Sequence, residues 1–297
     1  MIPAICFLGL IAMISAVVLY LCSRKFDVKE DPRKNKILNM LPLANCGGCG
    51  YPGCAGLAEA IVRAANSGTI DGLFCPVGGS LVMDRIAGVL GLSASAGDPL
   101  IAVVRCNGSC SVRPKFVEYS GLRTCAAINS CCFGEVGCGY GCLGCGDCVA
   151  ACRFDAIHID SITKLAVVDE SRCTACGACA KQCPRHLIEL RKKGVHGRRM
   201  YVACCNKGKG ASVVKACEVS CIGCGKCAKA CPFGAISISG NLAYIDPVKC
   251  RLCRKCEKEC PRNAIVSVNF PVVKKDESKS KIGNNAVSID KTKEVCL

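Results

Sequence analysis

The sequence contains no tryptophan, only 5% aromatic residues and three histidines among its 297 residues. With so few large side chains, one aromatic-rich core is not expected. Three histidines also argue against a hydrolase built on a Ser-His-Asp triad. A Walker-type phosphate loop is absent as well. Something other than a large hydrophobic core must therefore hold much of this fold together.

The first 22 residues form a long apolar run. From Ile2 to Cys22 there are 21 residues without a charge, and a helix of that length spans about 31 Å, the thickness of a bilayer core. Arg24 and Lys25 follow at once, so the positive-inside rule puts the rest of the chain in the cytoplasm. The alternative is a cleaved signal peptide, but the run is too long and lacks a basic start. We expect a single-pass anchor, residues 1–26, in the inner membrane.

Cysteine is abundant, with 32 residues, and much of it repeats one spacing. Four runs have the form Cys-x2-Cys-x2-Cys-x3-Cys: residues 142–152, 173–183, 221–231 and 250–260. This is the spacing of bacterial ferredoxins, in which the fourth cysteine of a run ligates the other cluster of a pair. Zinc sites usually use two separated Cys-x2-Cys pairs, and disulfides suit an oxidising compartment. Four such runs therefore predict [4Fe–4S] clusters.

The crossed ligation assigns four cysteines to each of four clusters. The predicted sets are Cys142, Cys145, Cys148 and Cys183; Cys173, Cys176, Cys179 and Cys152; Cys221, Cys224, Cys227 and Cys260; and Cys250, Cys253, Cys256 and Cys231. Short alternating segments follow the first run of each pair. They predict hairpins with turns at 161–163 and 239–241.

A fifth site is expected near the membrane. The loop Asn45–Cys54, with four glycines and a proline, supplies Cys46, Cys49 and Cys54, and Cys75 follows a predicted helix over 55–66. Zinc is the alternative here. The glycine-rich loop and the neighbouring ferredoxin runs favour a fifth [4Fe–4S] cluster.

The remaining cysteines suggest a larger repeat. The spacing Cys125-x12-Cys138-x3-Cys142 recurs as Cys204-x12-Cys217-x3-Cys221, always offset by 79. Upstream in the first copy lie Cys106 and Cys110, so a sixth cluster is considered at Cys106, Cys110, Cys125 and Cys138. The alternative is that these are buried thiols that pack as small apolar groups. The roles of Cys204, Cys205 and Cys217 stay open.

The fold class expected is α+β: one transmembrane helix, a small [4Fe–4S] domain and tandem two-cluster ferredoxin folds. The expected divisions are 1–26, the anchor; 27–96, the N-terminal cluster domain; 97–137, a cysteine-containing connector; 138–190, the first ferredoxin domain; 191–216, a connector; 217–270, the second ferredoxin domain; and 271–297, a polar tail.

Charge fits this assignment. The formal net charge is +16. A [4Fe–4S]²⁺ core with four thiolates carries about −2, so about five clusters would lower that charge to about +6. We therefore interpret the basic surplus as compensation for clusters and expect no nucleic-acid partner.

These features together resemble one known family. The apolar N-terminus, the loop ANCGGCGYPGC at 44–54 and the ferredoxin runs are similar to the B subunit of the Rnf-type ion-translocating electron-transport complex. Further stretches carry the resemblance at 104–108, 140–144 and 221–227. Many relatives have an apolar residue where Cys145 stands, and the resemblance then implies Cys138 as the alternative ligand.

The resemblance implies an electron relay that takes electrons from reduced ferredoxin into a complex that reduces NAD⁺ and moves Na⁺ or H⁺. No complete catalytic site is expected on this chain, and other membrane, flavin and iron–sulfur subunits are implied partners. The alternative is a polyferredoxin that serves a hydrogenase or a dehydrogenase. Residues 181–262 hold 18 lysines and arginines against five acidic residues, so an acidic ferredoxin is expected to dock on the second unit.

Overall fold

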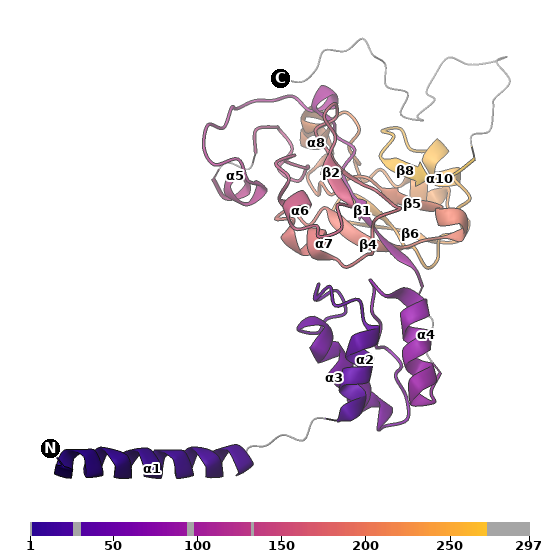
Figure 1. Cartoon of the computed structure of the whole chain (residues 1–297). Coiled ribbons are helices and arrows are strands. Elements are labelled where there is room, and N and C mark those ends of the chain that lie inside the picture. Colours follow the sequence, from indigo (N-terminus) through magenta and orange to yellow (C-terminus); the bar gives the residue numbers. More distant parts are fainter. Residues whose placement is uncertain (1, 26–30, 94–97, 132–133, 272–297) are drawn as a thin grey trace.

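The computed structural model describes residues 2–25, 31–93, 98–131 and 134–271 (Figure 1). Cys132 and the tail expected after residue 271, with Cys296, lie outside the described residues. Mixed helices and short strands make up the fold, as the sequence predicts.

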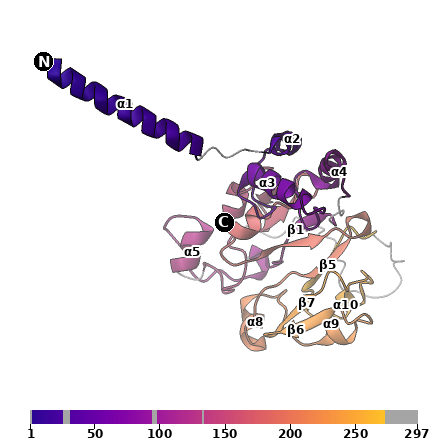
Figure 2. The same ribbon diagram turned by 90° about the horizontal axis from the view of Figure 1, so that it is seen from below.

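The N-terminal helix α1 runs from Ile2 to Lys25 and ends on two basic residues, Arg24 and Lys25. It lies apart from the other elements in both views (Figures 1 and 2). Large apolar side chains such as Phe7, Met13 and Leu19 are more than 60% exposed. Within the described part of the chain, no helix meets both the length and the apolarity required to cross a membrane.

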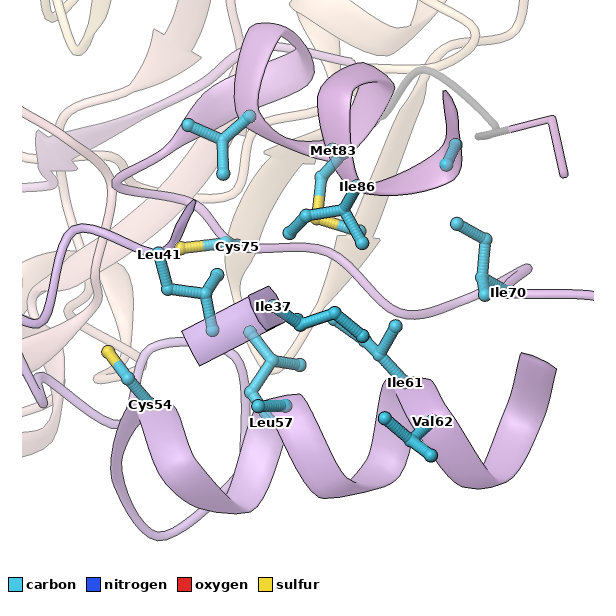
Figure 3. Close-up of a cluster of buried hydrophobic side chains, with 13 residues drawn as sticks. Ile37, Leu41, Cys54, Leu57, Ile61, Val62, Ile70, Cys75, Met83 and Ile86 are labelled. Carbon is cyan, nitrogen blue, oxygen red and sulfur yellow. The ribbon is translucent and has the colours of Figure 1, made fainter. Parts of the chain in front are cut away.

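Three helices form a separate small domain: α2 (Pro32–Met40), α3 (Gly53–Ala65) and α4 (Gly79–Leu90). Asp31 caps α2, because its side chain accepts a hydrogen bond from the amide of Arg33. Ile37, Leu57 and Ile61 meet Ile86 in the middle of the three helices (Figure 3). Each is at most 1% exposed, so this core stabilises the domain despite its small size.

Among the described residues, the first ferredoxin unit contains two antiparallel strand pairs, three short α-helices and one 3-10 helix. The elements are β1 (Leu100–Val104), η1 (Cys110–Val112), α5 (Cys125–Cys131), α6 (Asp147–Ala150), β2 (Ile157–Ile159), β3 (Ala166–Val168), α7 (Ala178–Gln182) and β4 (Ile188–Lys192). Strands β2 and β3 form the predicted hairpin. Strand β1 pairs with β4, with Val104 opposite Ile188, so part of the segment expected as a connector belongs to this unit's sheet.

The second unit repeats this plan. Its elements are η2 (Val195–Gly197), β5 (Arg199–Val202), α8 (Gly210–Ala216), α9 (Lys226–Lys229), β6 (Ile236–Ser239), β7 (Leu242–Ile245), α10 (Lys255–Lys258) and β8 (Ile265–Val268). Strands β6 and β7 form the second predicted hairpin, and β5 pairs with β8 with Val202 opposite Ile265. In Figure 2 the helices α2–α4 and the strands β6 and β7 lie on opposite sides of β1.

Side chains join the two units. Arg105 after β1 and Arg191 on β4 lie over the ring of Tyr244 on β7, 5.2 and 5.1 Å from its centroid. Glu170 of the first unit pairs with Arg199 at the start of β5. These contacts join the two cysteine-rich units.

Candidate metal centres

Three of the five predicted cysteine sets each line a pocket. One pocket is lined by Cys221, Cys224, Cys227 and Cys260, a second by Cys231, Cys250, Cys253 and Cys256, and a third by Cys46, Cys49, Cys54 and Cys75. Their volumes are about 360, 290 and 280 Å³. Each pocket therefore gathers four thiols, and in both ferredoxin pockets the fourth comes from the other run, as crossed ligation requires.

Glycine allows the backbone to form these loops. Gly144 and Gly223 hold equivalent places in the two units, with φ of +73° and +66°. A methyl group at Gly144 would lie 2.6 Å from the carbonyl oxygen of Lys164, and one at Gly223 would lie 2.5 Å from that of Asn241. The loop therefore packs against the hairpin turn only because glycine stands there.

Backbone amides point at several of the sulfurs. The amide of Ala156 donates to Cys152 at 3.4 Å, and that of Ala264 donates to Cys260 at 3.3 Å. In the N-terminal domain the amide of Gly78 donates to Cys75 at 3.3 Å. Such bonds favour the thiolate and raise the reduction potential of a bound cluster.

Burial acts in the opposite direction on the thiols. It raises the pKa of Cys148 and Cys256 to about 12 and that of Cys227 to about 11. A thiolate at these positions is therefore stable only beside a cation. Among the described residues, no three metal-binding side chains converge closely enough for a single ion. A cubane binds each thiolate to a different iron, so its ligands lie further apart than those of one zinc ion.

The set with Cys152 lies at a contact between domains. Burial raises the pKa of Cys179 to about 11, and the neighbouring thiols of Cys173, Cys176 and Cys152 contribute to this rise. A methyl group at Gly48, in the N-terminal cysteine loop, would lie 2.6 Å from the carbonyl oxygen of Cys176. The N-terminal loop therefore touches this cluster loop directly.

The first ferredoxin pocket contains Cys125, a cysteine that the sequence instead suggests for a sixth cluster. The pocket of about 380 Å³ beside β4 is lined by Cys142, Cys148, Cys183 and Cys125. The neighbouring thiol of Cys145 lowers the pKa of Cys125 to about 6. The thiols of Cys125 and Cys145 are therefore both candidates for the fourth ligand of the first ferredoxin cluster. No spacing rule points to Cys125, because it lies far upstream on α5.

The connector cysteines separate into different surroundings. Cys106 and Cys138 line one further pocket together with Cys204, Cys205 and Cys217. Cys110 is not in that lining, and its sulfur lies 3.2 Å from the carbonyl oxygen of Ile162. Cys138, the alternative ligand at the first ferredoxin site, lies in this further pocket and not in the pocket lined by Cys142, Cys148 and Cys183.

Comparison with known sequences agrees with this geometry. A family model described as "4Fe-4S dicluster domain" matches residues 141–187, 172–235 and 220–264. A second model, described as "Putative Fe-S cluster", matches residues 41–66. Both matches support [4Fe–4S] clusters as the cofactors of these pockets.

Curated relatives cover most of the chain. The B subunit of the Na(+)-translocating ferredoxin:NAD(+) oxidoreductase complex of Acetobacterium woodii is 41% identical over 80% of this chain and 69% of the relative. The B subunit of the ion-translocating oxidoreductase complex of Methanosarcina acetivorans is 37% identical over 78% and 85% of the two chains. The B subunit of the proton-translocating ferredoxin:NAD(+) oxidoreductase complex of Clostridium ljungdahlii is 36% identical over 80% and 81%.

The two family models match the N-terminal cluster loop and the ferredoxin runs, whose cysteines line several of these pockets. The chain is therefore an iron–sulfur protein of the Rnf type, and it belongs to the family of B subunits of the ion-translocating oxidoreductase complexes.

Proposed function

We propose that this chain relays electrons from reduced ferredoxin, through five [4Fe–4S] clusters, into a membrane complex that couples NAD⁺ reduction to ion translocation. The observation that supports the proposal is that three of the five predicted cysteine sets each line a pocket, and that the N-terminal cysteine loop contacts the loop of Cys176. Bound [4Fe–4S] clusters supply one-electron transfer at these positions. The chain supplies the thiolates, the amide donors and the fixed spacing. Ion movement and NAD⁺ reduction belong to the other subunits.

The second ferredoxin unit is the proposed entry point. Cys224 and Cys253 are exposed, whereas the corresponding Cys145 and Cys176 of the first unit are only partly exposed. Around the second-unit cluster loops, exposed cations are Lys226, Lys229, Lys249, Arg251, Lys255 and Lys258. Small ferredoxins are acidic, and opposite charge raises association rates by about 10- to 10³-fold at low salt.

The N-terminal domain is the proposed exit. Its loop at Gly48 reaches the backbone of Cys176, and Arg153 donates to the carbonyl oxygen of Ala44 at 2.8 Å. Electrons that enter at the second unit would thus leave through the domain that follows α1 in the chain.

Helix α1 is the proposed single-pass anchor in the cytoplasmic membrane, with all clusters on the cytoplasmic side. The support is the uncharged run from Ile2 to Cys22 in the sequence, followed by Arg24 and Lys25. The side chains of residues 2–6 and Leu8 lie outside the described residues, so the sequence carries this proposal.

The docking proposal is tested by charge reversal in the full chain loaded with clusters. A triple variant, Lys226→Glu, Arg251→Glu and Lys255→Glu, should slow reduction by ferredoxin about tenfold or more at low salt and flatten its salt dependence. Stopped-flow absorbance of the clusters measures the rate. Reduction by an uncharged photoreduced deazaflavin should be unchanged, because it needs no electrostatic steering.

A second triple variant gives the matched control. Lys36, Arg63 and Arg85 are exposed cations on α2, α3 and α4, outside the second unit, and their reversal to Glu changes the net charge by the same amount. If this control slows the ferredoxin reaction as much as the first variant, general charge and not docking sets the rate. An unchanged rate and salt slope in the first variant would discard the entry point.

A further inference from the structure

The pocket between the two ferredoxin units lies outside the five predicted cysteine sets. It has a volume of about 310 Å³, within the range of 280 to 380 Å³ of the four other thiol-lined pockets. It is lined by five cysteines, and the two units both contribute to it. We propose that it holds a sixth [4Fe–4S] cluster, ligated by Cys106, Cys138, Cys204 and Cys217. This inference rests on the proposed function, because it extends the same relay.

Strand register shows that the two units contribute equivalent cysteines. Val104 lies opposite Ile188 in one sheet, and Val202 lies opposite Ile265 in the other. Both isoleucines stand five residues after the last cysteine of their ferredoxin run. The backbone amide of the residue after each valine makes an equivalent hydrogen bond. The amide of Arg105 donates to the carbonyl oxygen of Leu187 at 2.7 Å, and the amide of Ala203 donates to that of Ala264 at 2.8 Å.

This register makes Cys204 the counterpart of Cys106, since each stands two residues after its strand. Cys217 is the counterpart of Cys138, four residues before the first ferredoxin cysteine of its unit. The constant offset of 79 had instead matched Cys204 with Cys125. The first unit has a longer excursion between its strand and its cluster loop, and this excursion hides the true equivalence from a linear comparison.

Hydrogen bonds to sulfur repeat the symmetry. The amide of Cys142 donates to the sulfur of Cys106 at 3.4 Å. The backbone of Cys221, at the equivalent place, lies against the thiol of Cys204. Each pair therefore links the interface pocket to the first cysteine of the adjacent ferredoxin run.

The four proposed ligands face a common space. A methyl group at Gly108 would lie 3.0 Å from the sulfur of Cys217, and one at Gly141 would lie 3.5 Å from that of Cys138. The side chain of Asn206 is buried and donates to the sulfur of Cys138 at 3.6 Å, while its own backbone amide donates to Cys204 at 3.5 Å. Asn206 thus bridges the two units at this pocket.

Buried positive charge suits an anionic cluster here. Arg113 is 5% exposed and lines the pocket; its Nε has no hydrogen-bond partner among the described residues. One terminal nitrogen of Arg113 donates to the carbonyl oxygen of Cys142 at 2.8 Å. Arg105 also lines the pocket and donates to the carbonyl oxygen of Cys204 at 3.4 Å. A buried cation is stable only beside negative charge, which a cluster with four thiolates provides.

Cys205 is the fifth cysteine of the lining, and symmetry excludes it as a ligand. Its counterpart in the first unit is Asn107, which is not a cysteine. Its side chain packs with the core of the first unit around Ala102 and Leu187. Cys205 therefore serves as a matched control for the neighbouring Cys204.

The position of this site explains its use in a relay. Cys106 adjoins the first cluster of the first unit through Cys142, and Cys204 adjoins the first cluster of the second unit through Cys221. A cluster here would bridge the two ferredoxin units, as the contact at Gly48 joins the first unit to the N-terminal domain. Six sites would then form one unbroken series.

Iron and sulfide analysis of the anaerobically purified full chain tests the proposal. The wild type should hold about 24 irons per chain, and Cys106→Ala and Cys217→Ala should each hold about 20. The double variant should also hold about 20, because both cysteines ligate the same cluster. Cys205→Ala and Cys131→Ala should keep about 24.

The five other clusters report on folding. Variants that retain about 20 irons, with the Mössbauer signature of intact cubanes, have folded units. A wild type with about 20 irons that neither single variant reduces would overturn the sixth cluster and leave the proposed relay intact. A double variant with about 16 irons would mean two separate sites and would equally overturn it. A wild type near 8 irons would instead reject the proposed function itself.

If removal of a ligand unfolds the protein, Gly108→Ala gives a second test. The added methyl group would enter the space beside Cys217 and Arg113 without removing any cysteine. We expect loss of about four irons from this variant and none from Gly88→Ala, where nothing lies within 4 Å of an added methyl group. Full iron content in Gly108→Ala would contradict the site.

Discussion

At the scale of residues, the contact between the two ferredoxin units depends on a few charged groups. Glu170 accepts hydrogen bonds from Arg199 on β5 and, at 2.8 Å, from Asn269 after β8. The Arg199 guanidinium, followed by Asn269, lowers the pKa of Glu170 below its ordinary value of 4.5. The folded state therefore favours the carboxylate, and this preference adds to stability where the carboxylate is ionised.

The change Glu170→Gln should lower the free energy of unfolding by about 0.5–1 kcal/mol at pH 7, a modest value because 31% of the side chain is exposed. The contribution is full above the ordinary pKa and is lost as the pH falls through the lowered folded pKa. The gap between wild type and variant should therefore close below about pH 4. The urea midpoint of cluster bleaching, measured across pH, tests this.

The matched control is Asp98→Asn. Asp98 pairs with Lys192 within the first unit, and both side chains are more exposed, at 61% and 45%. The Asp98→Asn change should therefore lower the urea midpoint of cluster bleaching less than Glu170→Gln does. Equal effects of the two variants would show that the pair at Glu170 contributes nothing specific to the contact between units.

At the scale of elements, α1 differs from the helices of the N-terminal domain. It lies apart from the other drawn elements (Figures 1 and 2), and its described apolar side chains, such as Phe7 and Leu19, are exposed. The apolar faces of α2, α3 and α4 instead meet in one core. The proposed anchor places this exposed apolar surface in a lipid bilayer, which suits the length of the uncharged run in the sequence.

Deletion of residues 1–25 should release a soluble protein with its full iron content, because no proposed ligand lies in that segment. The measurement is partition between washed membranes and supernatant when no other protein of the complex is present, with the full-length chain as the control. Retention of the truncated protein in the membranes would show that another segment binds lipid.

At the scale of the whole molecule, the proposed path depends on close contact between separately folded parts. The N-terminal loop approaches the first unit so closely that the backbone of Cys176 lies 2.6 Å from where a methyl group on Gly48 would be. Because backbone cannot yield as a flexible side chain does, any larger residue there must separate the two domains.

The variant Gly48→Ala should therefore slow reduction of the N-terminal cluster while leaving the ferredoxin-unit clusters as fast as in wild type. Freeze-quench EPR after mixing with reduced ferredoxin distinguishes the reduction of the N-terminal cluster from that of the ferredoxin-unit clusters. Gly88→Ala, on α4 of the same domain, has free space around its methyl group and should behave as wild type. Equal kinetics in all three proteins would mean that the exit path does not pass this contact.

Sequence alone determined the chemistry of most sites. The spacing of each ferredoxin run, such as Cys221 to Cys231, reflects a loop that must place three thiolates on one cubane, and such local geometry is encoded locally. The two hairpins, β2–β3 and β6–β7, were predictable for the same reason, because short alternating strands joined by turn residues pair with their neighbours.

Tertiary structure alone decided the relations between distant segments. Strand β1 pairs with β4 and β5 pairs with β8, so Cys106 and Cys204 are equivalent although no constant offset relates them to the runs. The same pairings assemble the interface pocket from both units. Cys125 comes near Cys145 because the first amides of α5 donate to the carboxylate of Asp147, far along the chain. Non-local pairing depends on the packing of whole sheets, which spacing along the chain does not record.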